Sequence, residues 1–226
     1  MKTFIKRALA TATLLAGAIS AHAAVIYTFN TTAVDKFGSG PYGTVTLTDT
    51  GANIDVSVVL RSDMNFVNTG GPHSVFSFNV LGAVSTDVTN VMFNGFTSAL
   101  YSVVAPGENQ PFGTNFSLMI DCTAKPACDN GAGGQIPDPL TFTVLNTEYT
   151  DFGFFATGTT AYFAADVICT GSTLSGCNGQ TGAIGVSGRG VSDGSPPPTG
   201  TLPEPGSLAL AALAILGAGF AGRRKI

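Results

Sequence analysis

Tryptophan is absent from this chain of 226 residues, and charged residues make up only 11% of it. The absence of tryptophan removes the largest aromatic surface that could stack on a sugar ring, which weighs against a glycosidase. Cations are especially scarce in the body of the chain, where only Lys36, Arg61, Lys125 and Arg189 occur. Thirteen of the fourteen acids lie in the same body, which therefore carries a formal charge of −9. A body this acidic repels phosphate backbones, so we expect no nucleic-acid partner.

Signatures of catalysis are also lacking. His73 is the only histidine after residue 23, and no G-x-S-x-G elbow accompanies it. The segment "GAGG" at 131–134 has no following lysine, so it is not a phosphate-binding loop. We therefore expect no catalytic residue and no cofactor, and the chain is predicted not to be an enzyme.

Two sets of acidic residues keep alternatives open. Glu108 and Glu148 are the only glutamates of the body, and a secreted hydrolase would have to use them as its carboxylate pair. Asp121, Asp129 and Asn130 flank a short loop that could offer oxygen ligands to calcium. The loop lacks the D-x-D-x-D-G pattern of a calcium-binding loop, so solvated acids are the simpler interpretation and no metal site is predicted.

The body contains four cysteines, an even number that predicts two disulfides in an exported chain. Their sequence order favours the two local pairs, Cys122–Cys128 and Cys169–Cys177. A four-cysteine zinc site is the competing interpretation. The spacings within the pairs are wider than those of zinc knuckles, which favours disulfides.

Short runs with alternating apolar and polar residues dominate the body. In "NIDVSVVLRS", for example, Ile54, Val56 and Val58 share one face of an extended chain. Glycine- and proline-containing turn signals separate such runs. The expected strands are 24–30, 44–48, 53–62, 74–80, 88–93, 97–104, 115–121, 140–145, 152–157, 160–168 and 183–187. This pattern predicts an all-β fold, an antiparallel β-sandwich or jelly roll, over residues 24–191.

The two ends of the chain differ from the body. Residues 1–23 have a basic start, an apolar run and the sequence Ala21-His22-Ala23, the layout of a helical signal peptide cleaved after Ala23. Residues 192–202 form a linker rich in proline, glycine and serine. Residues 205–222 are uncharged and would make a helix about 27 Å long at ~1.5 Å per residue, barely enough to span a membrane. The cations that follow would keep the C-terminus cytoplasmic.

The last segment, 203–226, resembles the PEP-CTERM sorting signal of Gram-negative bacteria that produce exopolysaccharide. The resemblance is carried by Pro203-Glu204-Pro205, the short apolar helix, and Arg223, Arg224 and Lys225. It implies that a membrane-embedded exosortase recognises the signal and cleaves near the tripeptide. The sortase signal of Gram-positive walls is similar, but it has threonine where this chain has Pro205. The stretch 161–185 also looks like a segment that recurs in PEP-CTERM proteins of unknown function, which implies a shared β-sandwich but no activity.

Taken together, these features predict an exported, non-enzymatic protein of the cell surface or extracellular matrix. The expected partners are the exosortase, the inner membrane through residues 205–222, and exopolysaccharide. The chain would be anchored transiently in the inner membrane and then released or retained at the surface. A lectin-like, carbohydrate-binding module of the exopolysaccharide matrix is the main alternative, and a secreted hydrolase is the third.

Overall fold

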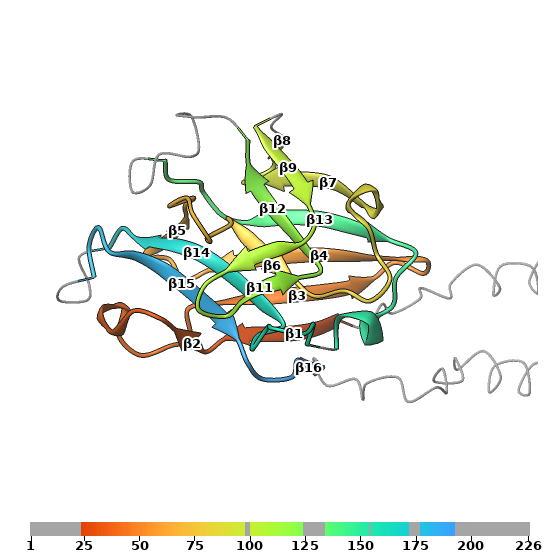
Figure 1. Cartoon of the computed structure of the whole chain (residues 1–226), viewed down its shortest axis with the longest axis horizontal. Helices are drawn as coiled ribbons and strands as arrows, with labels where there is room; N and C mark the ends of the chain where they lie inside the picture. The colour runs from red at the N-terminus through yellow and green to blue at the C-terminus, as the bar shows by residue number, and fades with distance from the viewer. Residues whose placement is uncertain (1–23, 98–99, 124–133, 154, 172–176, 193–226) are drawn as a thin grey trace, which may run out of the picture. The chain divides into compact units, whose positions relative to one another are not determined.

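A computed structural model describes residues 24–97, 100–123, 134–153, 155–171 and 177–192. The described residues form antiparallel β-sheets with three short 3₁₀ helices, so the predicted all-β class is confirmed (Figure 1). The predicted signal helix and C-terminal helix lie outside the described residues, as does the predicted linker 192–202 except for Ser192, which belongs to a strand. Within the described part, no helix is long and apolar enough to cross a membrane.

The first sheet has seven strands and carries the regular alternation expected from the sequence. Its strands, in spatial order, are β16 (Val191–Ser192), β1 (Ala24–Phe29), β3 (Gly43–Asp49), β4 (Asn53–Leu60), β13 (Leu140–Leu145), β7 (Val88–Phe93) and β8 (Phe96–Thr97). In β4, for instance, Ile54, Val56 and Val58 are buried whereas Asp55 is exposed. One face of this sheet therefore belongs to the core, and the other faces solvent.

The second sheet also has seven strands. Six are, in order, β2 (Thr31–Thr32), β15 (Thr181–Val186), β14 (Phe163–Cys169), β6 (Phe76–Phe78), β12 (Leu118–Cys122) and β9 (Tyr101–Val104). The seventh, β5 (Met64–Phe66), pairs with β14 off this path. Strands β10 (Gly107–Asn109) and β11 (Gly113–Phe116) form a separate two-stranded hairpin. The 3₁₀ helices are η1 (Asp35–Phe37), η2 (Ser85–Asp87) and η4 (Tyr149–Phe152).

Aromatic side chains join the two large sheets face to face. Phe142 of β13 lies with its ring centroid 5.1 Å from that of Phe78 in β6, and 6.0 Å from that of Phe76. At the other side of the core, the Tyr27 ring of β1 meets the Phe163 ring of β14 edge-on at 4.9 Å. These contacts bury large apolar areas and add edge or offset attraction between rings. The arrangement is that of a β-sandwich.

The second sheet is covered on its outer face as well. All seven residues of β14 are buried, although a strand with one solvent face would alternate. Phe112 and Phe116, from the β10–β11 hairpin, pack with Ala164 of β14 and Ala183 of β15 in a small second core. The hairpin therefore covers this sheet, and its side chains help to explain why no residue of β14 is exposed.

Some strand predictions were wrong. The described residues of the expected strand 152–157 form no strand. Asp151 accepts a hydrogen bond from the backbone N–H of Glu148 at 2.8 Å, and the chain forms η4 instead. The expected strand 115–121 is interrupted at Ser117, whose N–H donates to the Asn79 Oδ1 outside any strand ladder. The short strands β2, β5, β10 and β16 were not expected, since two or three residues are too few to show an alternating pattern.

Candidate functional site

The solvent face of the first sheet contains an open groove with a volume of about 380 Å³. It crosses β3, β4, β13 and β7. Its lining consists of Thr48, Asp55, Val56, Ser57, Asn90, Met92, Thr141, Phe142 and Thr143. Val56 and Phe142 point into the core and contribute little side-chain surface, because both are buried. The side chains that reach the groove carry hydroxyl, carboxylate, amide and thioether groups, but most of the exposed lining is apolar, because their carbon atoms contribute more of its surface than their polar atoms do.

The strand register arranges these groups in two parallel rows. In one row, Ser57 is paired with Thr141, which is paired in turn with Met92. In the other row, Thr48 is paired with Asp55, which is paired with Thr143. Neighbouring strands are about 4.8 Å apart, so each row presents polar groups at that interval. The Thr143 hydroxyl donates to Asp55 Oδ1 at 2.7 Å and holds that carboxylate in place.

A β-bulge forms one wall of the groove. The β7–β13 register shifts between Thr141 and Thr143, and Asn90 in this bulge has a φ of 56°. Asparagine adopts this left-handed conformation more readily than most residues. The bulge bends β7 locally and leaves Asn90 exposed at the groove.

Electrostatics restrict what the groove could bind. Among the described residues that line it, Asp55 carries the only charge. The groove thus offers several hydrogen-bond donors and acceptors but no cation to attract a phosphate, sulfate or carboxylate group. Its chemistry suits a neutral, hydroxyl-rich molecule. Sequence reasoning missed this site, although the alternating Thr and Ser residues of 44–48, 55–57 and 141–143 were a usable signal.

The predicted candidates for hydrolysis lie on different elements. Glu108 belongs to β10, in the hairpin over the second sheet, and its carbonyl accepts a hydrogen bond from Ser77 Oγ at 3.1 Å. Glu148 is exposed and directly precedes η4, after β13 of the first sheet. His73 forms an isolated antiparallel bridge with Asn109, the residue that follows Glu108. The hydrolase alternative gains no geometric support from these placements.

The remaining sequence-predicted residues divide between described and undescribed parts. Asp121 lies in β12, and its Oδ1 accepts a hydrogen bond from Asn68 Nδ2 at 2.8 Å. Asp129 and Asn130, the other two groups of the calcium alternative, lie outside the described residues. The sorting residues Pro203, Glu204, Pro205, Arg223, Arg224 and Lys225 lie outside them too, so their roles stay predictions.

The structure contains the Cys169–Cys177 disulfide expected from the sequence, with the Cα atoms 5.7 Å apart. Cys122 is also disulfide-bonded. Its expected partner Cys128 lies outside the described residues, so the Cys122–Cys128 pairing stays a prediction.

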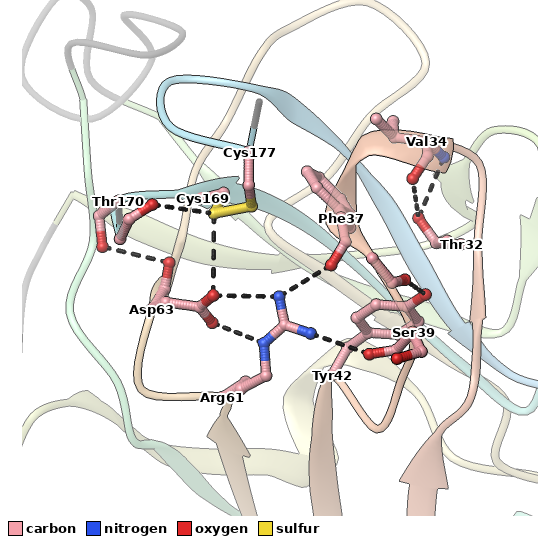
Figure 2. Close-up of a disulfide and its surroundings, with 12 residues drawn as sticks. Thr32, Val34, Phe37, Ser39, Tyr42, Arg61, Asp63, Cys169, Thr170 and Cys177 are labelled. Carbon is pink, nitrogen blue, oxygen red and sulfur yellow. Dashed lines mark hydrogen bonds and ion pairs between the residues drawn. A yellow bond between two sulfur atoms is a disulfide. The ribbon is translucent and has the colours of Figure 1, made fainter. Parts of the chain in front are cut away.

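Asp63 lies beside this disulfide, as Figure 2 shows. Ligand atoms of Asp63, Cys169 and Cys177 lie within 4.8 Å of one another, a spacing that would suit a metal ion. The two sulfur atoms are bonded to each other, however, and neither is a thiolate that could coordinate a metal. Asp63 is instead held by Arg61, through Nε to Oδ1 at 2.6 Å and through Nη2 to Oδ2 at 3.1 Å. This cluster is therefore structural.

Comparison with known protein families identifies one region of the chain. Residues 201–225 match the PEP-CTERM protein-sorting motif. The match confirms the resemblance of the C-terminal segment, and it implies secretion through the membrane, a C-terminal anchor before processing, and cleavage by an exosortase. No curated protein and no solved structure matches the chain.

Proposed function

We propose that this chain is a non-enzymatic protein of the cell surface or extracellular matrix, and that the groove on its first sheet binds a neutral matrix polysaccharide. The sorting motif at 201–225 is the observation that carries export and exosortase processing. The polysaccharide is the finer part of the proposal, and the groove supports it.

The C-terminal segment would act as a temporary anchor. The apolar residues 205–222 would hold the chain in the inner membrane, while Arg223, Arg224 and Lys225 stop its translocation. Pro203 and Pro205 would keep the recognition tripeptide extended and accessible to the exosortase, because proline disfavours helix at its own position and at the preceding one.

The groove supports a polysaccharide ligand through its shape and composition. It is open, which suits a polymer, and its rows of hydroxyls and the Asp55 carboxylate can exchange hydrogen bonds with sugar hydroxyls. Met92 offers an apolar surface to the C–H face of a sugar ring. The lack of a positive charge in the lining favours neutral over acidic polymers.

The sorting part is tested by Glu204→Ala in the exporting organism, with fractionation and intact-mass measurement of the product. We expect the variant to be exported but retained in the membrane with its C-terminal segment uncut. Glu148→Ala, a matched change at an exposed glutamate of the body, should be released like the wild type. Release of the Glu204→Ala protein with the wild-type C-terminus would contradict exosortase recognition of this tripeptide.

The binding part is tested on the mature protein by affinity electrophoresis in dextran, galactomannan and alginate gels. We expect retardation by a neutral polymer and none by acidic alginate. Ser57→Ala combined with Thr141→Val should weaken that retardation, because both changes remove hydroxyls from one row of the groove. Thr46→Val is the control, since Thr46 pairs with Ser57 on the same face but is outside the groove lining. Equal retardation of the double variant and the control would refute the assignment of the groove.

A further inference from the structure

The outer face of the second sheet buries polar side chains as well as the small apolar core. The loop 67–75 and the β10–β11 hairpin cover it. Asn109 and Asp166 are both fully buried, with a relative exposure of 0%. Asp166 lies in β14, and Asn109 is the last residue of β10 in the covering hairpin.

Asp166 is only half satisfied by the protein. Its Oδ2 accepts two hydrogen bonds from Thr69, one from the backbone N–H at 2.8 Å and one from the hydroxyl at 2.5 Å. Its Oδ1 is buried without any hydrogen-bond partner. Of the described cations, Arg61 is engaged with Asp63, and no ion pair joins Asp166 to a lysine or arginine in the described part of the chain. A buried carboxylate oxygen without a partner is costly, so a group that compensates it is expected.

Two further buried polar atoms have no hydrogen-bond partner. Asn109 uses its Nδ2 to donate to the Ser74 carbonyl at 2.8 Å, and its Oδ1 has no partner. His73 faces Asn109 across an antiparallel bridge, and its Nδ1 is likewise buried without a partner.

The backbone of residues 73–75 links these groups to Asp166. Val75 accepts a hydrogen bond from the Asp166 N–H at 3.3 Å, while the neighbouring Ser74 carbonyl accepts the bond from Asn109. In the described residues, Asp166 Oδ1, Asn109 Oδ1 and His73 Nδ1 are the buried side-chain nitrogen and oxygen atoms that lack a hydrogen-bond partner.

The electrostatics of Asp166 agree with this placement. Burial raises the pKa of the Asp166 carboxyl above its ordinary value, while the hydrogen bonds from Thr69 and the charge of His73 lower it. Burial is the largest of these effects.

We propose that Asp166 Oδ1, Asn109 Oδ1 and His73 Nδ1 together bind one divalent transition-metal cation. The donor set is one carboxylate oxygen, one amide oxygen and one imidazole nitrogen. Imidazole suits zinc, copper, iron and nickel, whereas carboxylate and amide oxygens alone would favour calcium or magnesium. The site is separate from the groove, which lies on the other sheet, and it is independent of the proposed polysaccharide binding.

Such a cation would tie three segments together. Asp166 belongs to the central strand β14, Asn109 to the hairpin, and His73 to the loop that leads into β6. Binding would neutralise the buried carboxylate and fix the hairpin and the loop on the sheet. Metal loading would therefore increase the stability of the folded protein by an amount that grows with the logarithm of the free metal concentration divided by its dissociation constant.

The test uses the mature protein purified without a histidine tag. Metal content is measured by mass spectrometry after dialysis against Zn²⁺, Mn²⁺ or Ca²⁺, and the melting temperature is measured with and without each ion. We expect about one equivalent of Zn²⁺ or Mn²⁺ and a raised melting temperature, with a weaker effect of Ca²⁺. His73→Gln should reduce the affinity by about 10-fold or more, since it removes the nitrogen ligand. Asp35→Asn, a carboxylate change at an exposed residue outside both proposed sites, should leave binding unchanged.

A second measurement does not depend on the folding of any variant. After cleavage at Ala23, His73 is the only histidine of the chain, so a ¹⁵N-labelled protein gives imidazole signals from one residue. Zn²⁺ should shift the His73 Nδ1 signal. The proposal is overturned if these signals do not respond to Zn²⁺, or if the metal content of the wild type stays near zero. It is equally overturned if His73→Gln binds metal like the wild type. A zero result would indicate that a proton or an enclosed water satisfies these atoms.

Discussion

Arg61 and Asp63 form a forked ion pair, with Nε donating to Oδ1 at 2.6 Å and Nη2 donating to Oδ2 at 3.1 Å. The same guanidinium also donates to the carbonyls of Phe37 and Ser39, at 3.0 and 3.2 Å (Figure 2). Asp63 Oδ2 lies 4.0 Å from the Cys169 sulfur, a packing contact rather than a hydrogen bond, because a disulfide sulfur carries no hydrogen. One arginine thus joins the turn after β4, the segment around η1 and the disulfide.

Arg61→Ala should destabilise the protein by about 2–3 kcal/mol, because it leaves Asp63 and two carbonyls without their donor. Arg61→Lys should recover only part of this loss, since a lysine cannot make the forked contact. The measurement is urea unfolding of the mature protein. Arg189→Ala, a change at an exposed arginine, should have a much smaller effect. Equal stability of the Arg61→Ala and Arg189→Ala proteins would show that the network contributes nothing.

Replacing Cys169 and Cys177 together with serine should lower the stability by about 2–3 kcal/mol. The two residues are 8 apart in the sequence, and this is the loss expected in the chain-entropy model for so short a loop. Non-reducing peptide mapping of the mature wild type should find Cys169 joined to Cys177, and Cys122 joined to Cys128. A peptide that links Cys122 to Cys169 or to Cys177 would contradict the local pairing.

Gly107→Ala should destabilise the protein by about 1–3 kcal/mol through overpacking. A Cβ at this position would lie 2.8 Å from the Leu118 carbonyl oxygen, and backbone atoms cannot swing aside as a flexible side chain can. The change would push the β10–β11 hairpin away from β12. Gly188→Ala is the control, because its nearest contact would be an ordinary 3.6 Å to Asn30. Thermal unfolding of both variants decides the matter, and similar melting temperatures would refute the tight approach of the hairpin.

Tyr27 should make the stability of the protein depend on pH in the alkaline range. Burial raises the pKa of this phenol above 10.0, nearby Tyr162 raises it further, and Arg189 lowers it. The unfolded chain therefore loses this proton at a lower pH than the folded chain does. The contribution is fully present below about pH 10 and is lost as the pH rises through the folded-state pKa.

Comparison of the wild type with Tyr27→Phe measures this contribution. From pH 9 to pH 11, the free energy of unfolding of the wild type should fall more steeply than that of the variant, which has no phenol to ionise at this position. The difference between the two free energies of unfolding at pH 7, where the phenol is not ionised, gives the effect of losing the hydroxyl group itself. Parallel curves over this range would mean that Tyr27 titrates alike in the folded and unfolded states.

The sequence by itself determined the fold class, the solvent and core faces of the long strands, and the sorting segment. The alternation in 53–60 and 140–145 is local, since successive side chains of a strand point to opposite faces whatever the strand pairs with. The sorting signal is a linear motif, and the Cys169–Cys177 pair spans so few residues that sequence proximity alone favoured it.

Only the tertiary structure decided which distant residues meet. Asp55 and Thr143 form one row because of the β4–β13 register, and the bulge at Asn90 depends on how β7 pairs with β13. The same holds for Asp166, Asn109 and His73, which come from three elements. The burial of polar Asp166 could not be read from its own strand, because it follows from the loop 67–75, where Thr69 bonds to Asp166, and from the β10–β11 hairpin, both distant in the sequence. The pairing register of the strands and the segments that cover a sheet both depend on residues far apart in the sequence. The physical reason is that they are set by the total burial of all packed segments rather than by any one segment.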